Sequence, residues 1–361
     1  MKIAQIAPLY EAVPPRLYGG TERVVAYLCD ALADAGHEVV LFSSGDAETK
    51  AELAVVRDQA IRLDPAPLKS DLAAHLSMLA EVRRRAHEFD VLHFHVDMLH
   101  FPFFEDIAAS TLSTLHGRLD IKDLAPVYTR WRRYPLVSIS NAQRRHLPDA
   151  NWLGTVHHGV PANLCRLSRS PQGYLAFLGR ISPEKRPDRA IAMAKRLGWP
   201  LKIAAKVDAA DRDYFKAEIE PLLDHPLIEF IGEIGDSGKS AFLGGADALV
   251  FPIDWPEPFG LVMIEAMAAG TPVIAWRCGS TPELVEDGLT GFIVGSDAEA
   301  DAALARAVAL DRTAIRRRFE QRFTARAMAE RYLALYGRLT PRRAPISAAT
   351  KRTDTALARI V

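Results

Sequence analysis

The sequence predicts an α/β protein made of two doubly wound domains that face a central cleft. One observation is the regular alternation of short apolar segments with amphipathic segments, which is typical of parallel sheets covered by helices on both faces. A second is the polar stretch RLSRSPQG at 166–173, after which the alternation restarts. A third is the length of 361 residues, which suits two domains of ordinary size.

The first series of elements begins with a buried strand at 2–7, followed by a loop rich in proline and glycine. Thr21 is then a candidate N-cap of a helix that ends at Gly36. A further helix is expected at about 70–88. The other strands expected in this series are 38–44, 90–95, 110–116, 136–140 and about 154–158.

The second series follows the polar stretch and has the same alternation. Its expected strands are 174–181, 201–207, 228–234, 248–253 and 272–277, and its expected helices are 184–197, 211–223, 237–244 and about 260–269. The predicted units are therefore a first Rossmann-like domain at 1–165, a second at 166–325, a C-terminal helix at 326–340 and a disordered tail at 341–361.

Composition indicates a cytoplasmic protein. The hydrophobic fraction is 49%, the charged fraction is 25% and the formal net charge is zero, so no nucleic-acid partner is expected. The three cysteines are scattered, which gives neither a disulfide framework nor metal-ligand spacing. Polar residues appear too early in the N-terminal segment for a signal peptide, and no apolar run reaches the length of a membrane span. No metal or other cofactor is predicted.

Several short motifs are better explained without a cofactor. The segment GEIGDSGKS at 232–240 has five residues between its first and third glycines, where a P-loop needs four. Asp211 and Asp213 form a D-x-D pair at an expected helix start, where capping explains them better than metal binding. The histidines at 93–100 lack further metal ligands and are expected to form a polar strand end that borders the cleft.

The segment WPEPFGLVMIE at 255–265 carries the strongest chemical signal. Pro258 prevents a helix before it, so a helix is expected to begin near Gly260, and its first backbone N–H groups form an anion site. Glu257 and Glu265 lie on either side of that site. Carboxylates are strong acceptors for sugar hydroxyls, so a diphosphate with a hydroxyl-rich ring at each end fits all three features. The pattern therefore predicts a nucleotide sugar as ligand.

The same segment resembles the E-x7-E signature of family 4 glycosyltransferases, retaining enzymes of the GT-B fold with two Rossmann-like domains. Four other segments resemble the family in the same order along the chain. They are GGTE at 19–22, FLGRISPEK at 177–185, FIGEI at 230–234 and GSTPELVEDGLTGFIV at 279–294. The resemblance covers about residues 1–337. It implies a metal-independent, retaining hexosyltransferase. It also implies that 1–165 is the acceptor-side domain, that 166–325 binds the nucleotide sugar, and that the helix at 326–340 packs back on the first domain.

The resemblance also implies ligands and roles. The donor would be a UDP- or GDP-sugar, and the acceptor a hydroxyl on a glycan, a lipid-linked molecule or a small molecule. Arg180 and Lys185 would neutralise the diphosphate in place of a metal, and His116 would lie near the anomeric carbon. Glu257 would accept from hydroxyls of the transferred sugar, and Glu265 from the ribose. The other implied donor-binding residues are Gly19, Gly20, Lys206, Ile234, Phe259, Gly260 and Leu261.

Other functions remain as alternatives at this point. A sugar phosphorylase or a nucleotide-sugar epimerase shares the fold, and fold alone does not fix function. A non-catalytic nucleotide-sugar binder would keep Glu265 and lose catalytic residues, whereas here each expected position is filled. A P-loop kinase would require ATP binding at Lys239.

Two basic segments are candidates for peripheral contact with the inner face of a membrane. Arginines at 83–85 lie on an expected helix, and the segment 130–133 (RWRR) combines cations with an interfacial aromatic residue. The alternative is a set of solvated arginines on an exposed helix, because acidic residues lie nearby at 88 and 90.

Overall fold

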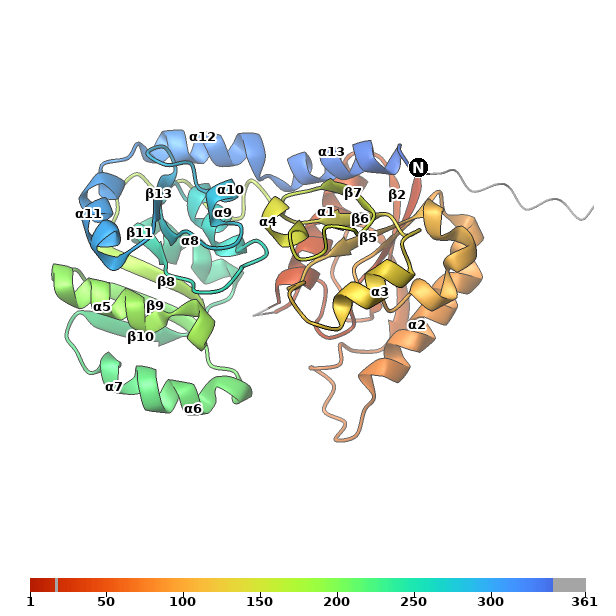
Figure 1. Cartoon of the computed structure of the whole chain (residues 1–361), viewed down its shortest axis with the longest axis horizontal. Coiled ribbons are helices and arrows are strands. Elements are labelled where there is room, and N and C mark those ends of the chain that lie inside the picture. The colour runs from red at the N-terminus through yellow and green to blue at the C-terminus, as the bar shows by residue number, and fades with distance from the viewer. Residues whose placement is uncertain (17–18, 340–361) are drawn as a thin grey trace, which may run out of the picture.

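In a computed structural model, which describes residues 1–16 and 19–339, the chain forms two α/β domains side by side (Figure 1). Each domain is built on one wholly parallel sheet, as the alternating pattern predicts. The tail predicted at 341–361 lies outside the described residues.

The first sheet has seven strands in the order β3-β2-β1-β4-β5-β6-β7. Their bounds are β1 (Lys2–Ile6), β2 (Glu38–Ser44), β3 (Glu52–Arg57), β4 (Val91–Phe94), β5 (Thr111–Leu115), β6 (Leu136–Ser138) and β7 (Trp152–Thr155). In register, Ile3 of β1 lies opposite Val39 on one side and Val91 on the other. Strand β3 was not predicted. It is an edge strand of six residues without a fully buried residue, and charged residues bound its short apolar run.

Helices of the first domain are α1 (Gly20–Asp34), α2 (Asp71–Arg85), α3 (Leu124–Arg130) and α4 (Asn141–Arg144), with 3-10 turns at Ala86–Glu88, Phe101–Phe103 and Glu105–Ser110. The prediction of Thr21 as the N-cap of the first helix is wrong. The helix begins at Gly20 with Gly19 as N-cap, so Thr21 lies within the first turn.

The second sheet has six strands in the order β10-β9-β8-β11-β12-β13. Their bounds are β8 (Tyr174–Arg180), β9 (Leu201–Lys206), β10 (Ile228–Gly232), β11 (Ala246–Phe251), β12 (Val273–Trp276) and β13 (Gly291–Val294). Strand β13 was not predicted, because four residues at a sheet edge give too short an apolar run to stand out.

The helices of the second domain are α5 (Pro187–Leu197), α6 (Arg212–Tyr214), α7 (Glu220–Leu223), α8 (Asp236–Gly245), α9 (Leu261–Ala268), α10 (Thr281–Leu284) and α11 (Asp297–Val308). The helix predicted at 211–223 is a composite of α6, a π-helical segment at Phe215–Ile219 and α7. Three-residue 3-10 turns occur at Pro183–Lys185 and Ala209–Asp211.

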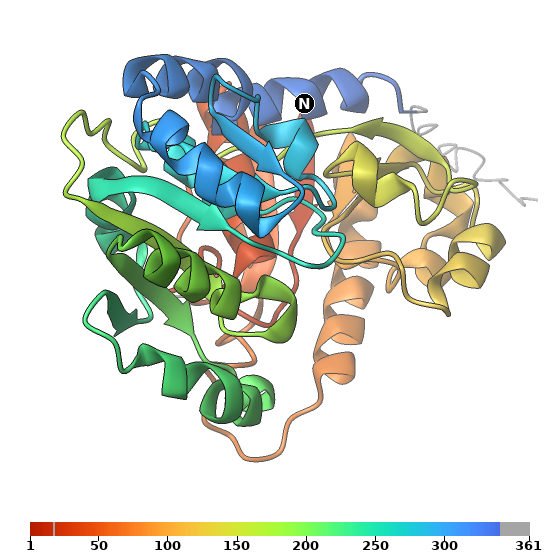
Figure 2. The ribbon, with the colours of Figure 1, turned by 60° about the vertical axis from the view of Figure 1, so that its left-hand side comes forward.

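Two C-terminal helices run along one side of both domains (Figure 1, Figure 2). Helix α12 (Arg312–Arg322) packs on α9 of the second domain, and α13 (Ala325–Tyr336) packs on α1 of the first. The helix predicted at 326–340 corresponds to α13. Between the two helices, the chain lies beside the linker, where the backbone N–H of Val160 donates to Phe323 O at 2.9 Å.

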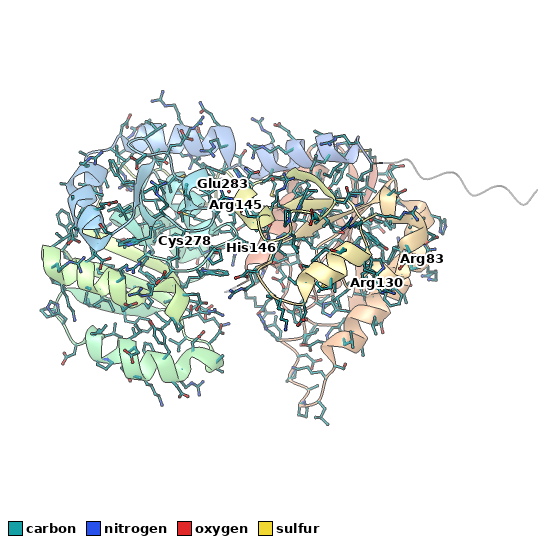
Figure 3. The ribbon with its side chains drawn as sticks, viewed as in Figure 1. Arg83, Arg130, Arg145, His146, Cys278 and Glu283 are labelled. Carbon is teal, nitrogen blue, oxygen red and sulfur yellow. The ribbon has the colours of Figure 1, made fainter. Side chains whose placement is uncertain are left out.

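A second link between the domains comes from Glu283 of α10, which lies at the domain junction (Figure 3). Its carboxylate accepts from the backbone N–H of Asn141 at 2.8 Å and of Ala142 at 2.6 Å, at the start of α4. Burial disfavours the ionised carboxyl, but hydrogen bonds from His157 and these backbone groups hold the pKa of Glu283 below its usual value.

Candidate active site

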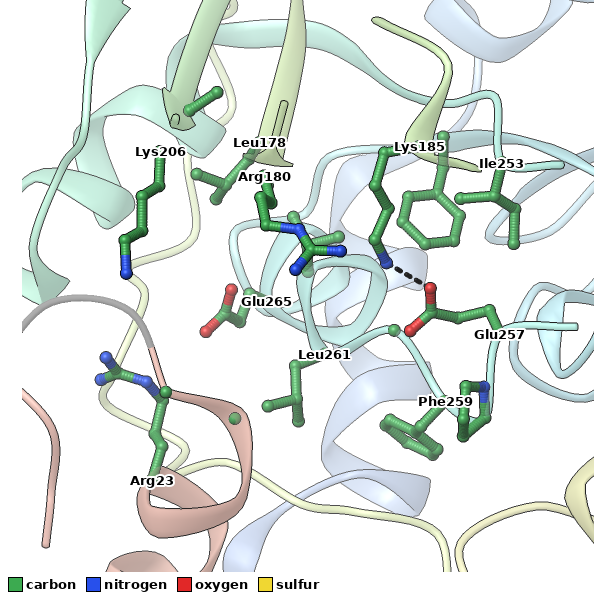
Figure 4. Close-up of a pocket in the computed structure, with 18 of the residues that line it drawn as sticks. Arg23, Leu178, Arg180, Lys185, Lys206, Ile253, Glu257, Phe259, Leu261 and Glu265 are labelled. Carbon is green, nitrogen blue, oxygen red and sulfur yellow. Dashed lines mark hydrogen bonds and ion pairs between the residues drawn. The ribbon is translucent and has the colours of Figure 1, made fainter. Parts of the chain in front are cut away.

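A cavity of about 460 Å³ lies between the domains, where strand carboxyl ends of both sheets meet. This volume is within the range of small-molecule sites. The twelve residues that the sequence analysis singled out all line it: Gly19, Gly20, His116, Arg180, Lys185, Lys206, Ile234, Glu257, Phe259, Gly260, Leu261 and Glu265. Figure 4 shows Arg180 and Lys185 directed into the space between the two carboxylates.

The start of α9 provides the anion-binding geometry at the centre of this cavity. Gly260 precedes the helix with a φ of 83°, which favours glycine, and a side chain there would crowd Met263 and Phe251. The loop after β12 supports the segment from behind. Ser280 donates its backbone N–H to Glu257 O at 3.0 Å and its hydroxyl to Phe259 O at 2.7 Å.

Glu257 is buried and tightly held. Lys185 Nζ and Trp255 Nε1 both donate to the same carboxylate oxygen, Oε2, the latter at 2.9 Å. The indole ring of Trp255 also contacts one cation from each domain. Lys185 Nζ lies 5.2 Å from the ring centroid, and Arg118 of the first domain lies 5.2 Å from it. These contacts fix the direction of the Glu257 carboxylate.

Arg180 lies among carboxylates of its own domain. Its guanidinium bonds to Glu184 at 2.6 Å and lies 3.4 Å from Asp211 and 3.7 Å from Asp208. Lys206 pairs with Asp208 at 2.9 Å. Asp211 occupies the N-cap position of α6, as predicted, but its side chain makes no cap hydrogen bond and lies beside Arg180.

Glu265 is almost fully buried at the other end of the cavity. Lys239 Nζ donates to its Oε1 at 2.8 Å. Lys239 belongs to the glycine-rich segment at 232–240, which does not match a P-loop, and no local pattern placed it beside Glu265. Other cavity-lining residues that sequence reasoning missed are Arg23, Arg118, His158 and Trp255.

His116 reaches the cavity at the end of β5 and is connected to a buried network. Its Nε2 lies 2.8 Å from Nδ1 of His95, whose Nε2 lies 2.8 Å from Oε1 of Gln5. Burial lowers the pKa of His116 to about 3, so its imidazole is neutral at physiological pH. The ring stacks on that of His158, with centroids 5.2 Å apart.

The prediction of a polar strand end at 93–100 is wrong for three of its histidines. His93, His95 and His100 are buried, and each has a pKa well below the usual histidine value because of that burial. His93 bonds through Nε2 to Thr114 at 2.7 Å and through Nδ1 to Tyr336 of α13 at 2.8 Å. His93 is thus part of the packing between the first domain and its returning helix, whereas His100 packs within the first domain against Phe94.

Within residues 1–16 and 19–339, no group of three or more histidine, cysteine or acidic side chains is arranged to hold a metal ion. None of the helices in these ranges combines the length and apolar character needed to cross a membrane.

Two facing doubly wound domains with a ligand-sized cavity between them define a GT-B protein. Solved structures of this fold match nearly the whole chain. Sucrose-phosphate synthase from Thermosynechococcus elongatus superposes with a TM-score of 0.75 at 21% identity, covering 93% of this chain and 98% of that one. The Anabaena protein HepE in complex with UDP and glucose gives 0.72 at 20% identity, covering 94% and 100%.

Sequence comparison identifies the family. Residues 18–165 match the family described as Glycosyltransferase Family 4, and residues 166–326 match Glycosyl transferases group 1. The chain belongs to these glycosyltransferases, retaining hexosyltransferases that move a sugar from a nucleotide sugar to an acceptor.

Curated relatives are similar over most of their length. The phosphatidyl-myo-inositol mannosyltransferase of Mycobacterium leprae is 27% identical over 346 residues, which cover 88% of this chain and 90% of the relative. A glycogen synthase of Mycobacterium tuberculosis is 28% identical over 392 residues, covering 89% and 92%. The two relatives act on different acceptors by name, so they leave the acceptor of this chain open.

Proposed function

We propose that this enzyme transfers a hexose from UDP- or GDP-sugar to an acceptor hydroxyl without a metal ion. The observation that carries the proposal is the placement of Glu257 and Glu265 on either side of the start of α9, in one cavity (Figure 4). The diphosphate would lie at the helix start between them, with Arg180 and Lys185 as its countercharges. Glu257 would bind hydroxyls of the transferred sugar, and Glu265 those of the ribose.

Other residues that line the cavity would supply the remaining donor contacts. Gly19 and Gly20 would approach the diphosphate from the first domain, and Lys206 and Ile234 would border the nucleoside. Backbone from Phe259 through Gly260 to Leu261 would hold the distal phosphate. His116, as a neutral imidazole, would lie beside the anomeric carbon.

Transfer with retention requires the acceptor to attack from the face that the phosphate leaves. Negative charge builds on the departing phosphate as the glycosidic bond breaks, and that phosphate accepts the proton of the attacking hydroxyl. Arg180, Lys185 and the start of α9 would stabilise this charge. With Lys185 bound to the diphosphate, its partner in the structure, Glu257, would be free to bind the sugar.

Replacing Glu265 with alanine is expected to weaken binding of the donor and of the free nucleoside diphosphate alike. Loss of a hydrogen bond to a charged group costs roughly 1.5–3 kcal/mol, which is about a ten- to hundredfold loss of affinity. Isothermal titration with UDP and GDP measures it, after thermal-shift screening of the two. Unchanged affinity would remove Glu265 from the binding site.

Activity is expected to survive EDTA, because cationic side chains stand where other transferases place a divalent ion. The measurement is donor turnover before and after dialysis against EDTA, with and without added Mg²⁺. A complete loss that Mg²⁺ restores would contradict the metal-free proposal and direct attention to Asp208 and Asp211 beside Arg180.

We further propose a cytoplasmic enzyme with a weak membrane-facing surface on the first domain. Arg83 and Arg130 mark that side of the domain (Figure 3). Ion pairs neutralise the first basic segment: Arg83 bonds to Asp106 at 2.7 Å, and Arg84 and Arg85 bond to Glu81 and Glu88 at 2.6 and 3.0 Å. The membrane prediction therefore rests on the exposed residues at 130, 132 and 133.

Binding to anionic vesicles is expected to be weak and sensitive to salt, since each basic residue contributes about 1 kcal/mol near such a surface. Co-sedimentation at low salt should be lost in the double variant Arg132→Glu/Arg133→Glu and kept in Arg84→Glu. Absence of binding by the unmodified protein would indicate an acceptor that is not held at a membrane.

A further inference from the structure

We propose that Lys239 and Asp236 of α8, together with Arg23 of the first domain, are positioning residues for the ribose end of the donor site. They hold the carboxylate of Glu265 in the orientation that accepts ribose hydroxyls. The proposal rests on the proposed role of Glu265 and extends it to three residues to which that role assigns nothing.

The four side chains form one continuous series of charge contacts across the domain boundary. Lys239 Nζ lies 2.8 Å from Glu265 Oε1 and 3.3 Å from Asp236 Oδ1. Asp236 Oδ2 accepts in turn from the guanidinium of Arg23, and the hydroxyl of Tyr27 lies 3.4 Å from the same oxygen. The charges alternate in sign along the series, from Arg23 to Glu265.

Burial makes these contacts directional. The side chains of Glu265 and Arg23 are each 3% exposed, and that of Lys239 is 12% exposed. A buried carboxylate is costly without a cationic partner, and Lys239 supplies that partner to Glu265. It also occupies one of the two carboxylate oxygens, which fixes the plane of the group and directs the other oxygen to a ligand.

Residues of this series reach the cavity from both domains. Arg23, Lys239 and Glu265 all line it, and Figure 4 shows Arg23 approaching from the first domain on the side of Glu265 and Lys206. Arg23 lies on α1, three residues after the Gly20 start of that helix. Its contact with Asp236 therefore places the first domain against the same α8 residue that holds Lys239.

If these residues position Glu265, their replacement should weaken nucleotide binding only when the ribose hydroxyls are present. The unmodified protein should bind a ribonucleoside diphosphate better than its 2′-deoxy form, because a hydroxyl bonded to Glu265 is missing from the latter. In Lys239→Met the affinity for the ribo form should fall roughly tenfold, as for a lost bond to a charged group. Affinity for the deoxy form should change little, so the ratio of the two should approach one.

The experiment is isothermal titration of the full chain with UDP and 2′-deoxy-UDP, or with GDP and 2′-deoxy-GDP if thermal shift selects guanine. Asp236→Asn and Arg23→Gln should lower the ribo-to-deoxy ratio in the same direction by smaller factors, and Lys239→Arg should preserve it. Lys202→Met is the matched control. That lysine also forms an ion pair, with Glu229 at 3.1 Å, and it does not line the cavity.

The outcomes separate this proposal from the one it rests on. No preference for the ribo form in the unmodified protein would contradict the role of Glu265 itself. A preference that Glu265→Ala abolishes and Lys239→Met keeps would overturn only the positioning role. Equal losses for both nucleotides in Lys239→Met would indicate a direct phosphate or base contact and would also overturn it. An unchanged ratio in Arg23→Gln would remove the first domain from the series. If Lys239→Met does not fold, Asp236→Asn carries the test.

Discussion

Replacing Lys185 with methionine is expected to lower kcat/KM by about 10²–10³-fold, the effect of removing one preorganised charge donor from a transition state. The ammonium group faces the diphosphate position and holds Oε2 of Glu257, so its loss affects both the leaving group and the carboxylate that binds the sugar. Binding of the free nucleoside diphosphate should weaken far less than catalysis.

Lys202→Met is the control for this experiment. Lys202 pairs with Glu229 at 3.1 Å and lies 4.9 Å from the centroid of the Tyr174 ring, which matches the ion pair and ring contact of Lys185 outside the cavity. Steady-state kinetics of both variants with a donor sugar gives the comparison. A Lys185→Met enzyme as active as the control would contradict the assignment of Lys185 to the leaving diphosphate.

Lowering the pH from 7 to 5.5 is expected to reduce the free energy of unfolding by about 5 kcal/mol. Burial depresses the pKa of five histidines, His93, His95, His100, His116 and His158. The unfolded chain takes up protons below about pH 6.5, whereas the folded protein does not, so stability is lost as the pH falls through that value. Each histidine contributes about 1 kcal/mol over this interval.

Urea unfolding at the two pH values measures the net effect. His100→Gln should remove one histidine's share of the pH dependence, and His146→Gln, at an exposed position, should remove none. Equal unfolding midpoints at pH 7 and 5.5 in the unmodified protein would contradict the prediction.

Much of the fold could be predicted because its core strands are short, largely apolar runs. The strands at one edge of each sheet, β3 and β13, give a weaker signal, since one is partly exposed and the other has four residues. The start of α9 was predictable for a local reason. The prolines before it stop any earlier helix, and Gly260 permits the left-handed backbone from which the helix begins.

The rest of the site depends on contacts between residues far apart in sequence. Trp255 lies beside Glu257, but its role depends on Lys185 and on Arg118 from the other domain. Lys239 meets Glu265 only because α8 and α9 pack together. The histidines at 93–100 gave a polar pattern, and the contacts that cover His93 come from Tyr332 and Tyr336 of α13. Local patterns contain no information on such contacts.

The crossing of α13 back onto α1 affects when the first domain is completed during synthesis. The seven strands of the first sheet are all synthesised by residue 155, yet Gln5 and His93 meet their hydrogen-bond partner, Tyr336, only at the other end of the chain. During synthesis on a ribosome, the first domain therefore emerges early. Its Gln5 and His93 have no Tyr336 to bond to until the entire second domain has been translated. The domain that begins first is the one that is completed last.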